Sequence, residues 1–341
     1  MIIEKRIDAF VKLGDDIRKG LIGDSLFEET IIKAKVHNPW FDPRFTRLAL
    51  ESIAGWLTQA NLEQWIAGYP TEYFADSDIK VGVIMAGNIP LVGFHDFLSV
   101  LISGKVFKGK LSSQDEILLP FLAGRLIAIE PAFKDKIVFV PQLLKDFDAV
   151  IATGSNNSAR YFDYYFGKYP NIIRHNRNSV AVLTGDETEG QLRKLADDIF
   201  MYFGLGCRSV SKIFVPRNYD FPKMLDTLSV YDFLSFHTKY FNNYEYNKSI
   251  YLLNKVPHFD NGFSLLTENI AYASPVSVLF YEEYDDLEAV ERRLMLESAQ
   301  IQCVVGGEKL QIEHENFGNA QSPRLNQYAD NVDVLDFLGG L

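Results

Sequence analysis

Cys207 is the residue of this sequence best suited to nucleophilic chemistry. It lies in the stretch YFGLGCRSVSKIFV, residues 202–215, between a glycine and an arginine, and it is one of only two cysteines in 341 residues. The thiolate is the attacking form of cysteine, and nearby positive charge lowers the thiol pKa from its usual value of about 8.5. Arg208 and His175 are the residues that we expect to favour ionisation. From the residues alone, this thiol can be a nucleophile in a polar turn or a small apolar residue.

The second cysteine has a different sequence environment. A cysteine is often buried as a small hydrophobic residue, which is the alternative interpretation for either thiol. Cys303 lies inside the strand-like run IQCVV, and we interpret it as such a buried residue. Two thiols in a chain of this size are typical of reduced cysteines, which predicts a cytoplasmic protein.

Composition and charge restrict the class of function. The chain is 47% hydrophobic and 23% charged, which is typical of a soluble globular protein. A net charge of -11 and a pI of about 5.1 argue against nucleic acid as a partner, because phosphates require a basic face. No apolar run approaches the roughly 18 residues of a membrane span, and no signal peptide is expected. The six histidines show no metal-ligand spacing, so no metal is predicted.

The elements that must position Cys207 alternate along the chain. The first 70 residues have helical periodicity, with helix starts expected at Asp42-Pro43 and Asn61. Short apolar runs then alternate with amphipathic ones, which predicts β-α-β units, a largely parallel sheet and two closely packed domains with a cleft between them. The predicted strands are 80–87, 105–110, 136–140, 148–154, 179–185, 212–216, 275–284 and 300–307.

One strand-to-helix turn has the composition of a phosphate site. Gly154 and Ser155 lie at the junction of the predicted strand DAVIATG and a predicted helix. Free amide groups and the helix dipole at such a turn can bind a phosphate. The same two residues can also be only a turn and a helix cap, and neither G-x-G-x-x-G nor G-x-x-x-x-G-K-[ST] occurs. Both interpretations remain open from the residues alone.

Three segments in order resemble the aldehyde dehydrogenase superfamily: MAGNIPLVGF (85–94), KGKLSSQDEIL (108–118) and FGLGCRS (203–209), with TGS between the last two. They are most similar to its acyl-CoA reductase branch, the LuxC-type fatty acid reductases of bacterial luminescence systems. The resemblance covers roughly residues 78–337. It implies an aldehyde-dehydrogenase-like α/β fold with two Rossmann-like domains and a cleft between them.

The resemblance assigns the catalytic residues. Cys207 corresponds to the superfamily's nucleophile, because it precedes Phe214 of the following strand by seven residues, as in the family pattern. Asn88 in GNIP corresponds to the asparagine whose amide contributes to the oxyanion hole, although an asparagine before Ile-Pro can also be only a turn residue. His175 is the candidate base, with a purely structural polar histidine as the alternative.

The resemblance also assigns cofactor contacts. Lys110 corresponds to the lysine at the adenosine ribose, and Gly154 and Ser155 to the turn at the pyrophosphate. Ser113 replaces the glutamate that holds the ribose hydroxyls of NAD, which favours NADPH. Glu268 corresponds to the glutamate at the nicotinamide ribose, with a two-residue difference in length.

A second departure from the family pattern concerns the deacylating base. The segment RHNRNSVAVL stands where hydrolytic family members have ELGGK, so Arg174 or His175 occupies the position of the water-activating glutamate. An enzyme that must not hydrolyse its acyl intermediate has reason to lack that base.

Together these features predict NADPH-dependent reduction of an acyl-CoA, by resemblance a long-chain fatty one, to its aldehyde through an acyl-cysteine. Residues 1–203 would form the NAD(P)-binding domain, 204–315 the catalytic domain, and 316–341 a tail that returns to the body or to a neighbouring subunit of a homo-oligomer. An acyl-protein synthetase or acyl carrier is a further expected partner. The alternatives are an oxidative aldehyde dehydrogenase and a degenerate acyl-transfer scaffold.

Overall fold

The computed structural model describes residues 1–154 and 156–341, and these divide into two compact units. Unit 1 consists of Met1–Asn176 and Arg324–Leu341, and unit 2 of Arg177–Pro323. The boundary therefore lies at residue 176, and the prediction of residue 203 was wrong in this respect. The strand that follows Arg177 pairs with strands of unit 2, and the alternation of elements in the sequence does not reveal which sheet a strand joins.

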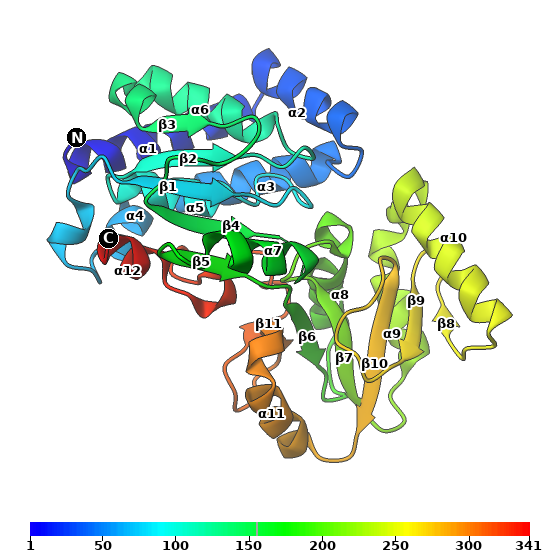
Figure 1. Ribbon diagram of the computed structural model, residues 1–341. Helices are drawn as coiled ribbons and strands as arrows, with labels where there is room; N and C mark the ends of the chain where they lie inside the picture. Colours follow the sequence, from blue (N-terminus) through cyan, green and yellow to red (C-terminus); the bar gives the residue numbers. More distant parts are fainter. Residues whose placement is uncertain (155) are drawn as a thin grey trace. The chain divides into compact units, whose positions relative to one another are not determined.

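Unit 1 begins with helices and continues as an alternating α/β unit (Figure 1). Asp42 caps the third helix by accepting a hydrogen bond from the backbone N–H of Arg44, as predicted, whereas the fourth helix is capped by Thr58 and not by Asn61. The elements of unit 1 are α1 (Ile3–Gly20), α2 (Ser25–His37), α3 (Pro43–Trp56), α4 (Gln59–Ile66), η1 (Thr71–Phe74), β1 (Lys80–Ile84), α5 (Phe94–Ile102), β2 (Val106–Lys110), α6 (Leu118–Ile129), β3 (Ile137–Phe139), β4 (Ala149–Thr153), α7 (Asn156–Phe166), β5 (Asn171–Arg174) and α12 (Val334–Gly339).

The sheet of unit 1 is parallel and has the strand order β3-β2-β1-β4-β5. The strands are short, nearly continuous apolar runs, which is typical of parallel sheets covered on both faces. Helix α5 packs against β1 and β2, and α7 packs against β4 and β5. The order reverses between β1 and β4, which defines a topological switch point of the kind that binds ligands in doubly wound folds.

A buried ion pair fixes the end of β5 to α5. The guanidinium of Arg174 donates two hydrogen bonds to the carboxylate of Asp96, at 2.6 and 2.7 Å, and a third to Thr153 Oγ1 at 3.1 Å. Arg174 is 8% exposed and Asp96 4%. Each of these buried charges requires the other, because a charge buried alone loses its hydration and gains no ion pair in return.

The C-terminal segment completes unit 1. Val334, Leu335 and Leu338 of α12 are buried in the same core as the N-terminal helices, and α12 packs against η1 and α5. A hydroxyl network adds to this packing, because Tyr328 accepts a hydrogen bond from Trp65 Nε1 at 2.8 Å and lies 2.7 Å from the Tyr69 hydroxyl. Unit 1 is therefore assembled from both ends of the chain.

Unit 2 is a second α/β unit. Its sheet has the order β12-β11-β6-β7-β10-β9-β8 and is parallel except for the β8–β9 pair. The described helices are each too short or too polar to cross a bilayer. The elements of unit 2 are β6 (Asn178–Val182), α8 (Glu189–Phe200), η3 (Met201–Gly204), β7 (Val210–Pro216), α9 (Phe221–Leu228), η4 (Ser229–Phe236), α10 (Thr238–Leu253), β8 (Phe259–Asp260), β9 (Leu265–Glu268), β10 (Val278–Tyr284), α11 (Leu287–Leu296), β11 (Ile301–Gly306) and β12 (Glu315–Asn316).

The buried ion pair gives a test of what holds unit 1 together. We expect Arg174→Ala to lower the free energy of unfolding by about 3–5 kcal/mol, because it leaves the Asp96 carboxylate buried without its partner. Arg292→Ala, which removes an exposed arginine that pairs with Asp286 at 3.4 Å, should cost at most about 1 kcal/mol. Urea denaturation of both variants measures the difference, and equal losses would contradict the argument.

Candidate functional site

The predicted residues of unit 1 gather at one edge of its sheet. The carboxyl ends of β1, β2, β4 and β5 are in register, because Ile84 pairs with both Lys110 and Ala152, and Thr153 pairs with Arg174. The turns that follow these ends therefore start side by side. Lys110 is the last residue of β2, and the turns carry Asn88, Ser113, Gly154 and His175.

These residues differ in exposure. Asn88, Ser113 and His175 are exposed, and Lys110 and Gly154 are half-buried. Ser155, the second residue of the predicted phosphate turn, lies outside the described residues. The side chains on these turns can therefore contact a ligand that binds at the carboxyl ends of the strands.

Gly154 is a site of close backbone approach. A Cβ atom built on Gly154 would lie 2.9 Å from both Ser158 Cβ and Phe162 Cε2 of α7, so a larger residue would push the helix away from the strand. Gly154 follows β4 and Asn88 follows β1, so the two turns flank the switch point of the sheet. The residues present thus fit a cofactor phosphate at this edge, where doubly wound folds bind dinucleotides.

The Asn88 turn is held by a residue that the sequence analysis did not identify. Asp115 accepts hydrogen bonds from the backbone N–H groups of Leu91 at 3.0 Å and Leu118 at 3.3 Å. Burial of this carboxyl raises its pKa to about 6. Asp115 joins the turn after β1 to the start of α6, and its position three residues before Leu118 was the only sequence signal, one shared by many helix caps.

The same region is supported from the N-terminal helices. His37 Nε2 lies 2.8 Å from the carbonyl oxygen of Ser113, and Asn38 donates to the carbonyl of Gln114 at 3.3 Å. A Cβ atom on Gly87 would lie 2.6 Å from Ser112 Oγ, so the turns after β1 and β2 also touch each other directly. The end of α2 therefore fixes the backbone that carries Ser113 and leaves its side chain exposed.

The two residues at the place of the family's water-activating glutamate have different roles. Arg174 is engaged in the ion pair with Asp96. The backbone N–H of His175 donates to Asp330 of the C-terminal segment at 3.3 Å, and its side chain is exposed. His175 remains the candidate base, and Arg174 is a structural residue.

Cys207 lies in the turn between η3 and β7 of unit 2, where it is exposed. Its carbonyl oxygen accepts a hydrogen bond of 2.9 Å from Ser179 Oγ of β6, and the same hydroxyl lies 3.1 Å from the Cys303 sulfur of β11. Neither cysteine forms a disulfide. Cys303 is half-buried, and its burial raises the pKa of the thiol, which favours the unreactive form. The exposed thiol is therefore the candidate nucleophile, and the Cys303 thiol contacts the Ser179 hydroxyl that also binds the Cys207 carbonyl.

The chain enters this turn through an unusual backbone. Tyr202, Phe203 and Gly204 have φ angles of 54°, 61° and 71°, all in the left-handed region. Bulky side chains rarely adopt this conformation. The two aromatic side chains are buried, and the ring of Phe203 lies 4.2 Å from that of His237. The direction of the Cys207 turn is thus set by buried rings.

Arg208 does not serve as an unengaged cation beside Cys207. Its guanidinium pairs with Glu315 at 3.2 Å and donates to the carbonyl of Ala320. Asp198 of α8 binds the same segment, because it accepts hydrogen bonds from the N–H groups of Gly318 at 2.6 Å and Ala320 at 2.9 Å. Burial raises the pKa of Asp198 to about 7. These contacts clamp the segment after β12 against the Cys207 turn.

Glu268 belongs to a different strand of unit 2 from β7, which follows the Cys207 turn. It is the exposed last residue of β9 and pairs in register with Tyr281 of β10. Its predicted contact with the nicotinamide ribose stays a prediction. Among the described residues, His, Cys, Asp and Glu side chains form no group of three that could hold a metal ion.

Comparison with protein families identifies one match. Residues 75–225 match the family described as acyl-CoA reductase (LuxC), a segment that contains Asn88, Ser113, His175 and Cys207. The resemblance seen in the sequence is confirmed for this segment, and Glu268 lies outside it. A search of curated proteins finds no match.

Solved structures confirm the fold. Aldehyde dehydrogenase 21 from Physcomitrella patens, in complex with its product succinate, has a TM-score of 0.72 at 11% identity. The match covers 99% of this chain and 85% of that protein's chain. A Mycobacterium tuberculosis aldehyde dehydrogenase with NAD+ has a TM-score of 0.65 at 13% identity, with 93% and 77% covered. A mutant of aldehyde dehydrogenase C from Pseudomonas syringae, with NAD+ and octanal, has 0.66 at 12% identity, with 91% and 74% covered. The chain has the aldehyde dehydrogenase fold.

Asp198, which binds the segment beside the Cys207 turn, should make the free energy of unfolding depend on pH. Because folding raises its pKa from 3.8 to about 7, the folded protein holds this proton more tightly than the unfolded chain does. Its contribution to the free energy of unfolding is therefore greatest below about pH 4 and decreases as the pH rises to about 7, by a few kcal/mol at about 1.4 kcal/mol per pKa unit.

Asp198→Asn removes this titration, so the difference in unfolding free energy between wild type and variant should change across that pH range and level off above it. Asp226→Asn, at an exposed aspartate of α9, is the matched control for the loss of one carboxylate. Urea denaturation at several pH values measures both. A constant difference for Asp198→Asn would contradict the raised pKa.

Proposed function

Because residues 75–225 match the LuxC acyl-CoA reductases and the fold is that of aldehyde dehydrogenases, we propose that the protein reduces an acyl-CoA thioester to its aldehyde with NADPH. The family match and the fold support an oxidoreductase acting on acyl or aldehyde groups. The observation that carries the proposal is the exposure of Cys207 on a turn whose carbonyl is held by Ser179.

A nicotinamide cofactor is supported by the edge of the unit 1 sheet. Lys110, Ser113 and Gly154 would hold it, with Glu268 as a further proposed contact. Similar structures, such as the Bacillus cereus and Mycobacterium tuberculosis aldehyde dehydrogenases, contain NAD+. When bound, the reduced cofactor would supply the hydride, and the residues of this chain would bind and orient it.

Ser113 is the reason for proposing NADPH over NADH. The side chain is exposed, and the family's NAD-binding glutamate is absent from this position. A neutral residue here would not repel a 2′-phosphate, whereas a carboxylate would. The backbone is already fixed by the contact between His37 and the Ser113 carbonyl, so the side chain can determine cofactor choice without moving the segment.

The proposed chemistry uses one nucleophile for both halves of the reaction. The Cys207 thiolate attacks the thioester carbonyl, an oxyanion forms, and its collapse expels the CoA thiolate and leaves an acyl group on the sulfur. Hydride addition to that carbonyl forms a second oxyanion, whose collapse releases the aldehyde and the Cys207 thiolate. The Asn88 amide and the Cys207 N–H are proposed as oxyanion donors, each contributing roughly 3–4 kcal/mol to lowering the barrier.

The acyl-cysteine must survive until hydride arrives. Arg174 or His175 stands where hydrolytic relatives have their glutamate, and the Arg174 guanidinium is bound to Asp96, so Arg174 cannot activate water. We propose the CoA ester of a long-chain fatty acid as the substrate class, with a protein-bound acyl group from an acyl-protein synthetase or acyl carrier as the alternative donor. A cytoplasmic location is proposed because the chain has only two cysteines, and a homo-oligomer is proposed on the resemblance to the family.

An acyl adduct on Cys207 is the direct test. Mixing the protein with an acyl-CoA in the absence of cofactor should add one acyl mass to wild type and to Cys303→Ser, but none to Cys207→Ser. Adding NADPH should then release the aldehyde and restore the unmodified mass. Intact-mass spectrometry with peptide mapping measures both steps.

The other outcomes of this experiment separate the alternatives. Prompt hydrolysis of the adduct to free acid would indicate an oxidative aldehyde dehydrogenase. Absence of any adduct on a folded protein would indicate a scaffold that has lost the reaction. Either result would contradict the proposed reductase.

Cofactor preference has a test of its own. Ser113→Glu should lower kcat/KM for NADPH by roughly tenfold or more, because a carboxylate beside the 2′-phosphate is repulsive. Ser113→Gln has nearly the same size without the charge and should retain the preference for NADPH. Steady-state kinetics with NADPH and NADH measure the ratio, and an unchanged ratio in Ser113→Glu would contradict the assignment.

A further inference from the structure

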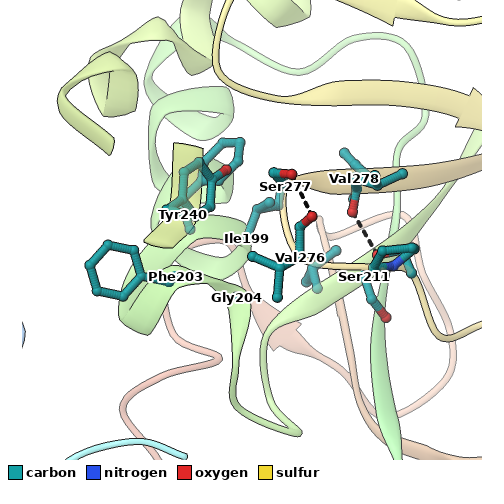
Figure 2. A pocket seen from close by; sticks show the side chains of 13 residues that line it. Ile199, Phe203, Gly204, Ser211, Tyr240, Val276, Ser277 and Val278 are labelled. Carbon is teal, nitrogen blue, oxygen red and sulfur yellow. Dashed lines mark hydrogen bonds between the residues drawn. The ribbon is translucent and has the colours of Figure 1, made fainter. Parts of the chain in front are cut away.

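A small pocket lies beside the Cys207 turn in unit 2. It encloses about 30 Å³, which is room for about two water-sized groups at roughly 10–15 Å³ each. Its walls come from the end of α8, from η3, from the start of β7, from α10, and from the start of β10 with the segment that precedes it (Figure 2). A pocket of this size takes a substituent, not a whole acyl chain.

The mouth of the pocket is next to the nucleophile in the chain. Gly204 and Pro275 form its exposed rim, and Gly204 precedes Cys207 by three residues. Val210 and Ser211, just after the Cys207 turn, line the pocket as well. The backbone segments before and after Cys207 therefore also line the pocket.

The lining combines apolar side chains with hydroxyl and backbone polar groups. Three serine hydroxyls are satisfied by backbone carbonyls: Ser211 donates to Tyr272 at 2.8 Å, Ser274 to Val278 at 2.6 Å, and Ser277 to Val276. The remaining interior wall is formed by apolar side chains, namely Ile199, Phe200, Phe203, Val276, Val278 and Leu279.

Tyr240 supplies the one hydroxyl of this lining that has no such partner. Its side chain is 1% exposed, and its hydroxyl forms no hydrogen bond with any residue in 1–154 or 156–341. Burial raises the pKa of this phenol, so the hydroxyl keeps its proton and can donate. A buried hydroxyl without a partner costs about 1–3 kcal/mol. A ligand oxygen in the pocket would remove that cost.

We propose that this pocket is a subsite for an oxygen-bearing substituent of the acyl substrate, such as a hydroxyl group close to the thioester, and that Tyr240 is the specificity-determining residue that donates to it. The inference rests on the proposed reductase function, because it requires the acyl group to be carried on Cys207. It narrows the substrate class from acyl-CoA in general to acyl-CoA with an oxygen near the reacting carbon.

The test compares acyl-CoA esters of one chain length, unsubstituted or carrying a hydroxyl at successive carbons from the thioester. Wild type should show a higher kcat/KM for one positional isomer than for the unsubstituted ester. In Tyr240→Phe, which deletes only the hydroxyl, this preference should fall by about tenfold, the value of one hydrogen bond. Tyr244→Phe is the matched control, because Tyr244 is buried on the same helix and donates to Asp260 at 2.7 Å.

The outcomes distinguish the inference from the function on which it rests. If wild type reduces none of the esters, the proposed function fails and the inference with it. If the esters are reduced but wild type shows no positional preference, or Tyr240→Phe keeps the same preference, the subsite is refuted and the pocket holds only water. An equal loss of preference in Tyr244→Phe would also overturn it, because the effect would then be structural.

Discussion

A left-handed backbone at Tyr202, Phe203 and Gly204 is the constraint on which the Cys207 turn depends. Each non-glycine residue in this conformation costs roughly 1–2 kcal/mol. Burial of a large apolar side chain contributes roughly 1.5–3 kcal/mol, so the packing of the two aromatic rings offsets the cost. The backbone can then leave α8, reverse, and present Cys207 at the surface. Gly204 needs no such compensation, which suits its exposed place at the pocket rim.

Much of the secondary structure could be predicted from the sequence, because long apolar runs between turns are local features. The strands at 80–84, 106–110 and 210–216 lie where they were expected. β5 and β9 were missed, since each has only four residues and no clear alternation. The unit boundary was misplaced for a different reason: β6 follows the elements of unit 1 in sequence but pairs with β7 and β11, and strand pairing is not encoded locally.

The sequence analysis identified individual residues of the candidate site, but not the residues that hold them in position. Cys207 is identified by a short motif and a spacing, and its exposure agrees with the proposed role. Ser179 and Asp115 could not be found this way, because their function arises from contacts with residues distant in sequence. Arg208 shows the same limit: its adjacency to the thiol is visible in the sequence, but its contacts with Glu315 and Ala320 are not.

The discontinuity of unit 1 has a consequence for biosynthesis. Unit 2 is one uninterrupted stretch of chain, whereas the core of unit 1 also needs residues 334–338. During translation the second unit can close as soon as it has emerged, while the first waits with the surface for α12 uncovered. Domains fold as units during synthesis, and uncovered apolar surface invites aggregation. The core of unit 1 can therefore be complete only after residues 334–338 have been synthesised.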